Sequence, residues 1–243
     1  MRQTMNVAAA LVMVMAVVVG TAHLISAEEA PKAKTRIFML QGGGHDWKNH
    51  FPILAEILKK TGDFDVTISE DMDQLKIENI KKYDVVLLYG SGQNFSDPAQ
   101  EKGLCDFVRS GGALAGIHSA TDSFKKSDAY WELIGGRFSG HGGGKFMVRI
   151  EDKNHPITKG LQDFEITDET YRHKYHEKAK RHDLIRMDRG KEQQSMAWVR
   201  DYGKGRVFYT SLGHGRPAWT NPHFQRLAVR GIYWAVKRDV KDP

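Results

Sequence analysis

Short apolar segments that alternate with helical patterns constrain the fold of this chain more than any other feature. The apolar segments are residues 36–40, 64–69, 83–90 and 113–120. YDVVLLYG at 83–90 is almost continuously apolar, which is typical of a strand buried on both faces of a sheet. Helical patterns at 52–60 and 98–109 separate the segments. Strands that alternate with helices predict an α/β fold, with a mostly parallel sheet, right-handed crossovers and helices on both faces.

The second half of the chain has a different pattern, with apolar segments and little helix between them. These segments are residues 145–150, 183–187, 195–202 and 206–212. The sequence DYGKG at 201–205 is typical of a hairpin turn between the last two. We therefore expect antiparallel strands in the C-terminal half of the sheet, followed by a final helix over about 224–237.

The N-terminus has the pattern of a secretory signal peptide. Arg2 precedes an apolar run at 7–19, and Ala22 and Ala27 are both candidate cleavage points. The run is about 13 residues long, whereas a helix that crosses a bilayer needs about 20. We predict a signal peptide over 1–27, a polar linker over 28–34 and one domain over 35–240, in a periplasmic or secreted protein without stable membrane insertion after leader removal. Retention of the leader as an anchor is the alternative.

Charge and cysteine content exclude several classes of protein. The formal net charge is +6, but the lysines form isolated pairs rather than a basic track, so we expect no nucleic-acid partner. Cys105 is the single cysteine, which excludes an intramolecular disulfide and any metal site with two thiolates from this chain. The glycine-rich runs GGGHDW and GHGGGK lack the spacings of nucleotide-binding loops, so no nucleotide is expected.

Histidines beside glycines recur in four predicted loops, at His45, His118, His141 and His214. Ligands of open α/β sheets bind outside the carboxyl ends of the strands. His45 and His118 follow predicted parallel strands, and His214 follows the last strand. We therefore expect these imidazoles to gather at one edge of the sheet.

His118 occupies the turn position at which a nucleophile elbow would carry serine or cysteine. Covalent catalysis from this position is therefore not expected, whereas an imidazole suits metal ligation or acid–base chemistry. Neutral imidazoles with a carboxylate are typical of a catalytic zinc or similar ion. Glu169, in the segment TDETY, is the candidate carboxylate.

Several motifs, in order, resemble the ThuA-like (trehalose utilisation) family. They are HDWKNHFPIL, YDVVLLY, GGALAGIHSATDSF, YWELIGGRFSGH, HPITKGL, DETY, AWVRDYGKGRVFYTSLGH and GIYWA, between Thr35 and Lys237. The resemblance implies a flavodoxin-like, class I glutamine amidotransferase-like fold and a role in sugar metabolism, on trehalose-type or 3-keto-glycoside substrates. By position, His118 would replace the amidotransferase cysteine and His214 would resemble its catalytic histidine, so glutaminase activity is not expected.

Together these features predict a carbohydrate-active hydrolase, lyase or isomerase. We expect His118, His214 and Glu169 to be catalytic, and a divalent metal such as zinc to be held by those residues with His141. Further residues are expected to bind substrate: His45, Asp46, Trp47, Asp122, Tyr171 and Trp219. The partner would be a small carbohydrate, with a homo-oligomer left open. The alternatives are a metal-free histidine pair, and a non-enzymatic carbohydrate-binding or sensing protein whose affinity depends on Trp47 or Trp219.

Overall fold

A computed structural model of the protein describes residues 33–190 and 192–243, and residues Ala33–Pro243 form one compact unit. Its strands are β1 Thr35–Gly43, β2 Phe64–Ser69, β3 Val85–Ser91, β4 Ala113–Ile117, β5 Gly136–Ile150, β6 Phe164–Tyr175, β7 His182–Arg189, β8 Glu192–Tyr202 and β9 Gly205–Thr210. Its α-helices are α1 Trp47–Lys60, α2 Ile77–Ile80, α3 Pro98–Arg109, α4 Asp128–Ile134, α5 Arg216–Trp219 and α6 Pro222–Ala235, with 3-10 turns η1 Met72–Leu75 and η2 His118–Asp122.

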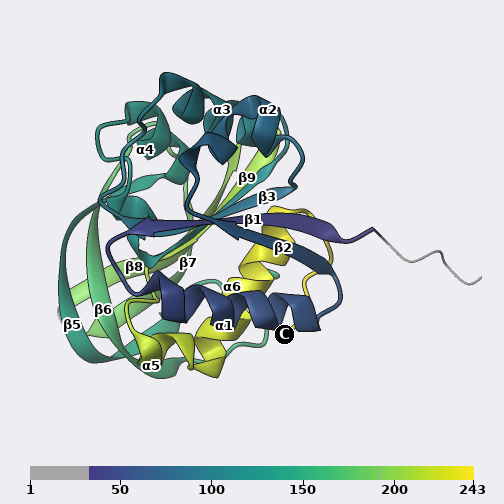
Figure 1. Ribbon diagram of the computed structural model, residues 1–243. Coiled ribbons are helices and arrows are strands. Elements are labelled where there is room, and N and C mark those ends of the chain that lie inside the picture. The colour runs from purple at the N-terminus through teal and green to yellow at the C-terminus, as the bar shows by residue number, and fades with distance from the viewer. Residues whose placement is uncertain (1–32, 191) are drawn as a thin grey trace, which may run out of the picture. The chain divides into compact units, whose positions relative to one another are not determined.

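The described strands form one mixed sheet in the order β2-β1-β3-β4-β9-β8-β7-β5-β6 (Figure 1). The first five strands in this order pair in parallel, and the pairs from β9 to β6 are antiparallel. Figure 1 shows α2, α3 and α4 on one face and α1, α5 and α6 on the other. The α/β class, the mixed sheet and the helices on both faces are therefore confirmed.

Two apolar clusters hold these layers together, one on each face of the sheet. Because successive side chains of a strand point to opposite faces, Ile37 and Met39 pack with α1 and α6, whereas Phe38 and Leu40 pack with α3 and α4. This two-sided burial explains why the parallel strands have nearly continuous apolar sequences.

Local sequence explains where the two long helices near the parallel strands begin. Asp97 caps α3 by accepting from the main-chain N–H of Ala99 at 2.8 Å, and Gln100 completes a capping box. Helix α1 begins at Trp47, five residues before the helical pattern predicted at 52–60. The additional turn forms because Trp47 and Phe51 bury their side chains in the core.

The least accurate predictions concern β5 and β6. The glycine-rich segment around His141 was expected to be a loop but belongs to β5, where it pairs with β6. The charged segment YRHKYHEKAKRHD at 171–183 has a composition typical of a solvated surface, but His173 is partly buried in β6 and His176 is buried just after it.

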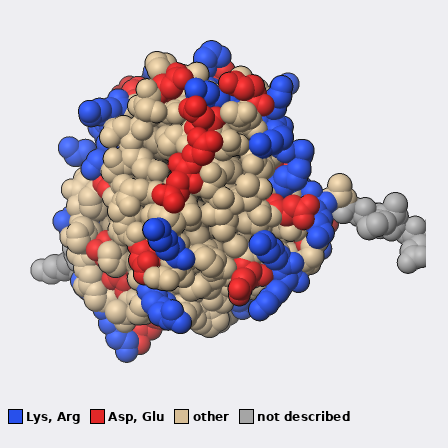
Figure 2. All heavy atoms as spheres, in the orientation of Figure 1, with Lys and Arg blue, Asp and Glu red and all other residues tan. Residues whose placement is uncertain are grey.

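The predicted signal peptide, 1–27, and residues 28–32 of the predicted linker lie outside the described residues. Within the described part of the chain, none of the helices has the length and apolar character needed to cross a bilayer. Figure 2 shows Lys and Arg in separate groups on one face of the molecule, with Asp and Glu between them.

Candidate functional site

Three histidines meet at the carboxyl ends of parallel strands. His45 follows β1, His118 begins η2 directly after β4, and His214 follows β9. The ring centroids are 4.9 Å apart for His45 and His118, 5.2 Å for His45 and His214, and 5.4 Å for His118 and His214. One nitrogen of each ring can be chosen so that all three lie within 4.8 Å of one another. We call these residues the histidine triad.

His118 is fixed more firmly than the other two members of the triad. Its side chain is fully buried, and its main chain has φ +46°, in the left-handed region. Nδ1 lies 2.6 Å from the main-chain oxygen of Ser211, which can only accept, so Nδ1 carries the hydrogen. Nε2 is buried without a hydrogen-bond partner among the described residues. In the neutral form of this imidazole, the lone pair is therefore on the buried Nε2.

Glu169 connects the triad to His141. Its carboxylate lies 3.5 Å from Nε2 of His118, 3.3 Å from Nδ1 of His214 and 3.3 Å from Nδ1 of His141. Burial opposes ionisation of this carboxyl, but the contact with His118 and the nearby imidazoles of His214 and His141 outweigh it and lower the pKa of Glu169. Glu169 is therefore ionised near pH 7.

Alternate residues of β6 face the turn that carries His118. Glu169 contacts its ring, Tyr171 packs against it with a centroid distance of 4.2 Å, and His173 lies 3.3 Å from the hydroxyl of Thr121 in η2. Tyr209 completes this buried network by donating its hydroxyl hydrogen to the main-chain oxygen of His118 at 2.7 Å. The period-two pattern E-x-Y-x-H at 169–173 was the sequence signal that could have located this strand.

Asp168, the neighbour of Glu169, holds the segment that carries His214. Its buried carboxylate accepts from the main-chain N–H groups of Gly213 at 2.7 Å and His214 at 3.0 Å. Burial raises the pKa of Asp168, although His118 and the two main-chain donors oppose the shift. Two adjacent residues of β6 therefore position the triad and contact it.

His45 also has left-handed backbone geometry, with φ +73°. Its ring lies over Tyr89 with a centroid distance of 5.9 Å. Burial, followed by the nearby His118 and His214, lowers the pKa of His45 to about 4. The imidazole is therefore neutral near pH 7 and offers a lone pair.

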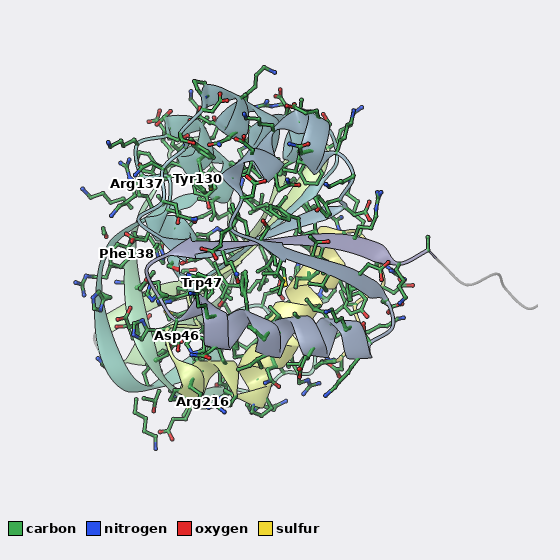
Figure 3. The ribbon with its side chains drawn as sticks, in the orientation of Figure 1. Asp46, Trp47, Tyr130, Arg137, Phe138 and Arg216 are labelled. Atoms are coloured by element: carbon green, nitrogen blue, oxygen red, sulfur yellow. The ribbon has the colours of Figure 1, made fainter. Side chains whose placement is uncertain are left out.

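The aromatic residues that were expected to bind substrate lie mostly inside the protein. Trp219 is 1% exposed and donates from Nε1 to the main-chain oxygen of Gly213 at 2.7 Å, so its ring has little surface on which a sugar could stack. Trp47, labelled with Asp46 at the start of α1 in Figure 3, is 9% exposed and belongs to the core. Tyr171 is 2% exposed and supports His118 instead of offering a free ring face.

The two aspartates expected to bind substrate differ in their surroundings. Asp46 is exposed at the N-terminus of α1, where both of its carboxylate oxygens accept from the side chain of Asn49 at 2.9 Å. Asp122 is partly buried and accepts from the hydroxyl of Ser91 at 2.5 Å and from Lys125 at 2.8 Å. Only Asp122 has its carboxylate held toward the interior.

The set of residues able to hold a metal differs from the set expected from the sequence. That set was His118, His141, Glu169 and His214, whereas the structure groups His45 with His118 and His214. His141, half exposed in β5, reaches the triad only through Glu169. The sequence did not indicate the supporting roles of Tyr209 and Ser211, because their contacts join distant segments.

Comparison with known proteins agrees with this architecture. The family model described as ThuA, trehalose utilisation, matches residues 36–235. None of the curated proteins matched the chain.

Solved structures with the same fold have low sequence identity. A ThuA-like protein from Parabacteroides merdae is 22% identical, with a TM-score of 0.76 over 86% of this chain and 92% of that chain. One from Bacteroides uniformis is 19% identical, with a TM-score of 0.70 over 86% and 94%. A GMP synthase subunit from Thermoplasma acidophilum is 11% identical, with a TM-score of 0.51 over 84% and 94%, in agreement with a class I glutamine amidotransferase-like fold.

Proposed function

This chain belongs to the ThuA, trehalose utilisation, family, and on that premise we propose that it is an enzyme that acts on a sugar or glycoside at the histidine triad. In this proposal Glu169 is the proton acceptor, and the three imidazoles hold a divalent metal. The observation that carries the proposal is the buried Nε2 of His118, which has no hydrogen-bond partner among the described residues and faces two further imidazoles.

The donor set fits a divalent metal of the zinc type. Zinc sites with an open catalytic position commonly use three protein ligands, with Zn–N distances of about 2.0–2.1 Å. Nitrogens of such a tetrahedral site are about 3.3 Å apart, and the triad nitrogens lie within 4.8 Å of one another. To bring the three nitrogens to this spacing, the rings of His45 and His214 would rotate slightly, because the ring of His118 is held by Ser211. A hydrogen bond from the ring nitrogen that does not bind the metal is the usual way in which a ligating histidine is oriented.

A bound divalent metal would supply Lewis acidity that stabilises negative charge on a substrate oxygen. The chain itself supplies proton transfer. Glu169 is ionised and contacts two triad rings, which suits removal of a proton from carbon next to a keto group or from a hydroxyl. His141, partly exposed and 3.3 Å from Glu169, is placed to return a proton to a departing sugar oxygen.

We assign the substrate class as trehalose-type glycosides or their 3-keto derivatives. In a 3-keto-glycoside the C2 hydrogen is acidified by the neighbouring carbonyl. Its removal by Glu169, with cleavage of the C1–O bond and protonation of the leaving oxygen by His141, completes an elimination. Proton removal at the same carbon begins an isomerisation, and activation of water by the same carboxylate would give hydrolysis.

Metal titration and turnover test the two parts of the proposal separately. Protein stripped with a chelator is titrated calorimetrically with Zn²⁺ and Mn²⁺, and turnover of 3-keto-glycosides is followed by chromatography. We expect one metal per chain, and loss of both metal binding and turnover in His118→Ala. His182→Ala, an exposed histidine on β7 outside the triad, is the matched control and should behave as wild type.

Two outcomes contradict the proposal in different ways. Equal turnover by the wild type and His118→Ala would remove the catalytic assignment of the triad. Full turnover in the stripped protein, with no metal bound on titration, would remove the metal and leave a histidine–carboxylate acid–base site.

The non-enzymatic alternative has less support. Sugar binding without catalysis was expected to depend on Trp47 or Trp219, and their burial leaves little ring surface for a sugar to contact. We also propose that the protein acts after export, on the evidence of its leader-like N-terminus. Cell fractionation of the full chain and of a variant without residues 2–27 tests this part, and identical cytoplasmic retention of both would contradict it.

A further inference from the structure

An irregularity in strand β5 lies beside the proposed reaction site. Between Phe138 and Gly140 the pairing of β5 with β6 shifts by one residue, so Ser139 has no partner in β6. Residues three positions apart in a regular strand point to opposite sides of the sheet. Because the β-bulge inserts one extra residue between them, Phe138 and His141 instead point to the same side.

The register of the two strands shows which side this is. Phe138 lies opposite His173, and His141 lies opposite Tyr171. Side chains directly opposite each other in an antiparallel pair share a face, and Tyr171 also shares its face with Glu169, two residues before it. The bulge therefore brings Phe138 to the face that carries Glu169. In Figure 3, Phe138 lies at the side of the molecule where α1 begins.

The ring contacts of Phe138 agree with this placement. Its ring centroid lies 4.4 Å from that of Tyr171 and 6.0 Å from that of His141, which it meets with 28° between the ring planes. Tyr171 packs against His118, and Glu169 lies 3.3 Å from Nδ1 of His141. Phe138 is therefore one ring away from the triad and next to the proposed proton donor.

Phe138 also differs in exposure from the other aromatic residues around the site. Among the described residues, the Phe, Tyr and Trp rings that contact the triad or His141 belong to Tyr89, Tyr171 and Phe138. Tyr89 and Tyr171 are buried, whereas Phe138 is partly exposed. A sugar ring that packs on it would remove apolar surface from water. Phe138 therefore offers the ring surface that the sequence analysis expected of Trp47 or Trp219.

A hydrogen-bond donor lies beside this ring. Nζ of Lys125 is 5.9 Å from the ring centroid of Phe138, at the outer limit of a cation–π contact, and 2.8 Å from Oδ1 of Asp122. An ammonium group carries three hydrogens, so the contact with Asp122 leaves two for other acceptors. The Lys125 side chain is 48% exposed, so these hydrogens can reach a hydroxyl group of a bound sugar.

We propose that Phe138 and Lys125 form the subsite for the departing sugar of the glycoside, and that this subsite makes the protein prefer disaccharides to glycosides with a small leaving group. The inference rests on the proposed function, in which Glu169 removes a proton from the ring that reacts and His141 protonates the leaving oxygen. Along β5, His141 lies between Phe138 and Gly143, which is opposite Glu169. The departing ring therefore lies beyond His141, on the side of Phe138.

Binding of two unoxidised glycosides tests the subsite without turnover. Trehalose and methyl α-glucoside share one glucose ring, and only trehalose has the second ring, so calorimetric titration compares them directly. We expect the wild type to bind trehalose about tenfold more tightly. Phe138→Ala should lose about tenfold in affinity for trehalose and keep its affinity for methyl α-glucoside.

Two further variants separate the contributions of the ring and of the donor. Phe138→Trp keeps an aromatic face and should retain trehalose binding. Lys125→Gln should weaken trehalose binding by about threefold, because it loses the charged donor, and should leave methyl α-glucoside unaffected.

Phe95→Ala is the matched control for the loss of a ring. Phe95 is also partly exposed, but its ring stacks on Phe124 with a centroid distance of 4.0 Å and, among the described residues, contacts neither the triad nor His141. It should bind both glycosides as the wild type does. If Phe138→Ala does not fold, Phe138→Leu carries the test, because leucine fills the space but has no flat face and should weaken trehalose binding by about threefold.

Turnover separates failure of the subsite from failure of the proposed reaction. With the 3-keto derivatives of both glycosides, Phe138→Ala should raise KM for 3-keto-trehalose and leave kcat/KM for the methyl glycoside unchanged. Trehalose binding that depends on Phe138, in a protein that turns over neither derivative, would support the subsite and contradict the proposed reaction. Equal losses of affinity for both glycosides in the folded variants, unchanged trehalose affinity, or no trehalose binding by the wild type would overturn the subsite.

Discussion

The imidazole of His118 donates its Nδ1 hydrogen to the main-chain oxygen of Ser211, 2.6 Å away. The carbonyl at the end of β9 therefore sets the tautomer of a histidine at the end of β4, and these strands are neighbours in the sheet. The tautomer leaves the lone pair on Nε2, which faces the triad. The parallel pairing thus determines both where this ring lies and which nitrogen is available.

Left-handed backbone at His118 predicts an unusual order of stability between two truncations. Both His118→Ala and His118→Gly lose the hydrogen bond to Ser211, but alanine retains the strain of φ +46° and glycine does not. We expect His118→Gly to be more stable than His118→Ala by about 1 kcal/mol. Urea unfolding at pH 7 measures the difference, and the opposite order would contradict the strain argument.

Replacement of Asp168 should loosen the segment that carries His214. Asp168→Asn presents an NH₂ group to one of two main-chain N–H donors, so we expect a loss of about 1–3 kcal/mol in the free energy of unfolding, together with weaker metal binding. Asp201→Asn, at a side chain that is 80% exposed, should change stability by less than about 0.5 kcal/mol. Equal effects of the two substitutions would contradict the role of Asp168 in holding the segment that carries His214.

Burial of His173 predicts a loss of stability in acid. Burial, with Arg181 and His118 nearby, lowers the pKa of His173 to about 3, whereas an unfolded histidine titrates near about 6.5. Below about pH 6.5 the unfolded chain binds a proton that the folded chain does not, so this contribution is complete above that pH and is lost as pH falls.

A variant isolates this contribution of His173. Between pH 6.5 and pH 5 the wild type should lose about 1–2 kcal/mol more than His173→Gln, as measured by urea unfolding at each pH. Parallel stability curves for the two proteins would rule out a buried neutral imidazole at this position.

The thiol of Cys105 should be unreactive in the native protein. Cys105 is buried in α3, and burial raises the pKa of the thiol to about 12, which leaves almost no thiolate at pH 8. We expect labelling by a disulfide reagent only at the rate of unfolding, and immediate labelling in denaturant. Rapid stoichiometric labelling of the folded protein would contradict this packing.

Replacing each of two glycines by alanine should have different effects on stability, because only one of the two has a left-handed backbone and a close main-chain neighbour. Gly43 has φ +69°, and an added Cβ would lie 2.0 Å from the main-chain oxygen of Ser91, so Gly43→Ala should destabilise the protein and displace nearby His45. Gly143 in β5 meets only the main-chain oxygen of Asp168 at 3.8 Å, so Gly143→Ala should be tolerated. Thermal unfolding and metal titration compare the two, and similar losses would refute the distinction.

The sequence predicted the parallel half of the sheet well because local signals and tertiary burial agree there. Residues 64–69 and 98–109 form β2 and α3 with the expected bounds, since apolar content and a capping aspartate mark them. The loops after β1, β4 and β9 bring His45, His118 and His214 together because these strands are parallel.

The structural predictions failed where long-range pairing and packing outweigh local composition. The run GHGGGK has no apolar pattern, yet it is extended because β6 supplies its hydrogen-bond partners. The charged segment around His173 is partly buried because β6 packs against η2, a contact between residues 52 positions apart. Trp219 is buried because its ring stacks on His50 of α1, with a centroid distance of 5.5 Å. Single-sequence patterns do not contain such long-range contacts.

The pairing of β5 with β6 also has an evolutionary consequence. His141 lies opposite Tyr171, and Gly143 lies opposite Glu169, so His141 and Glu169 are diagonal neighbours on adjacent strands. Inserting or deleting a single residue in either strand would turn one of the two side chains to the reverse side and separate them. Descendants of this chain can vary their surface loops in length, but the gain or loss of one residue in either strand would break the contact between His141 and Glu169.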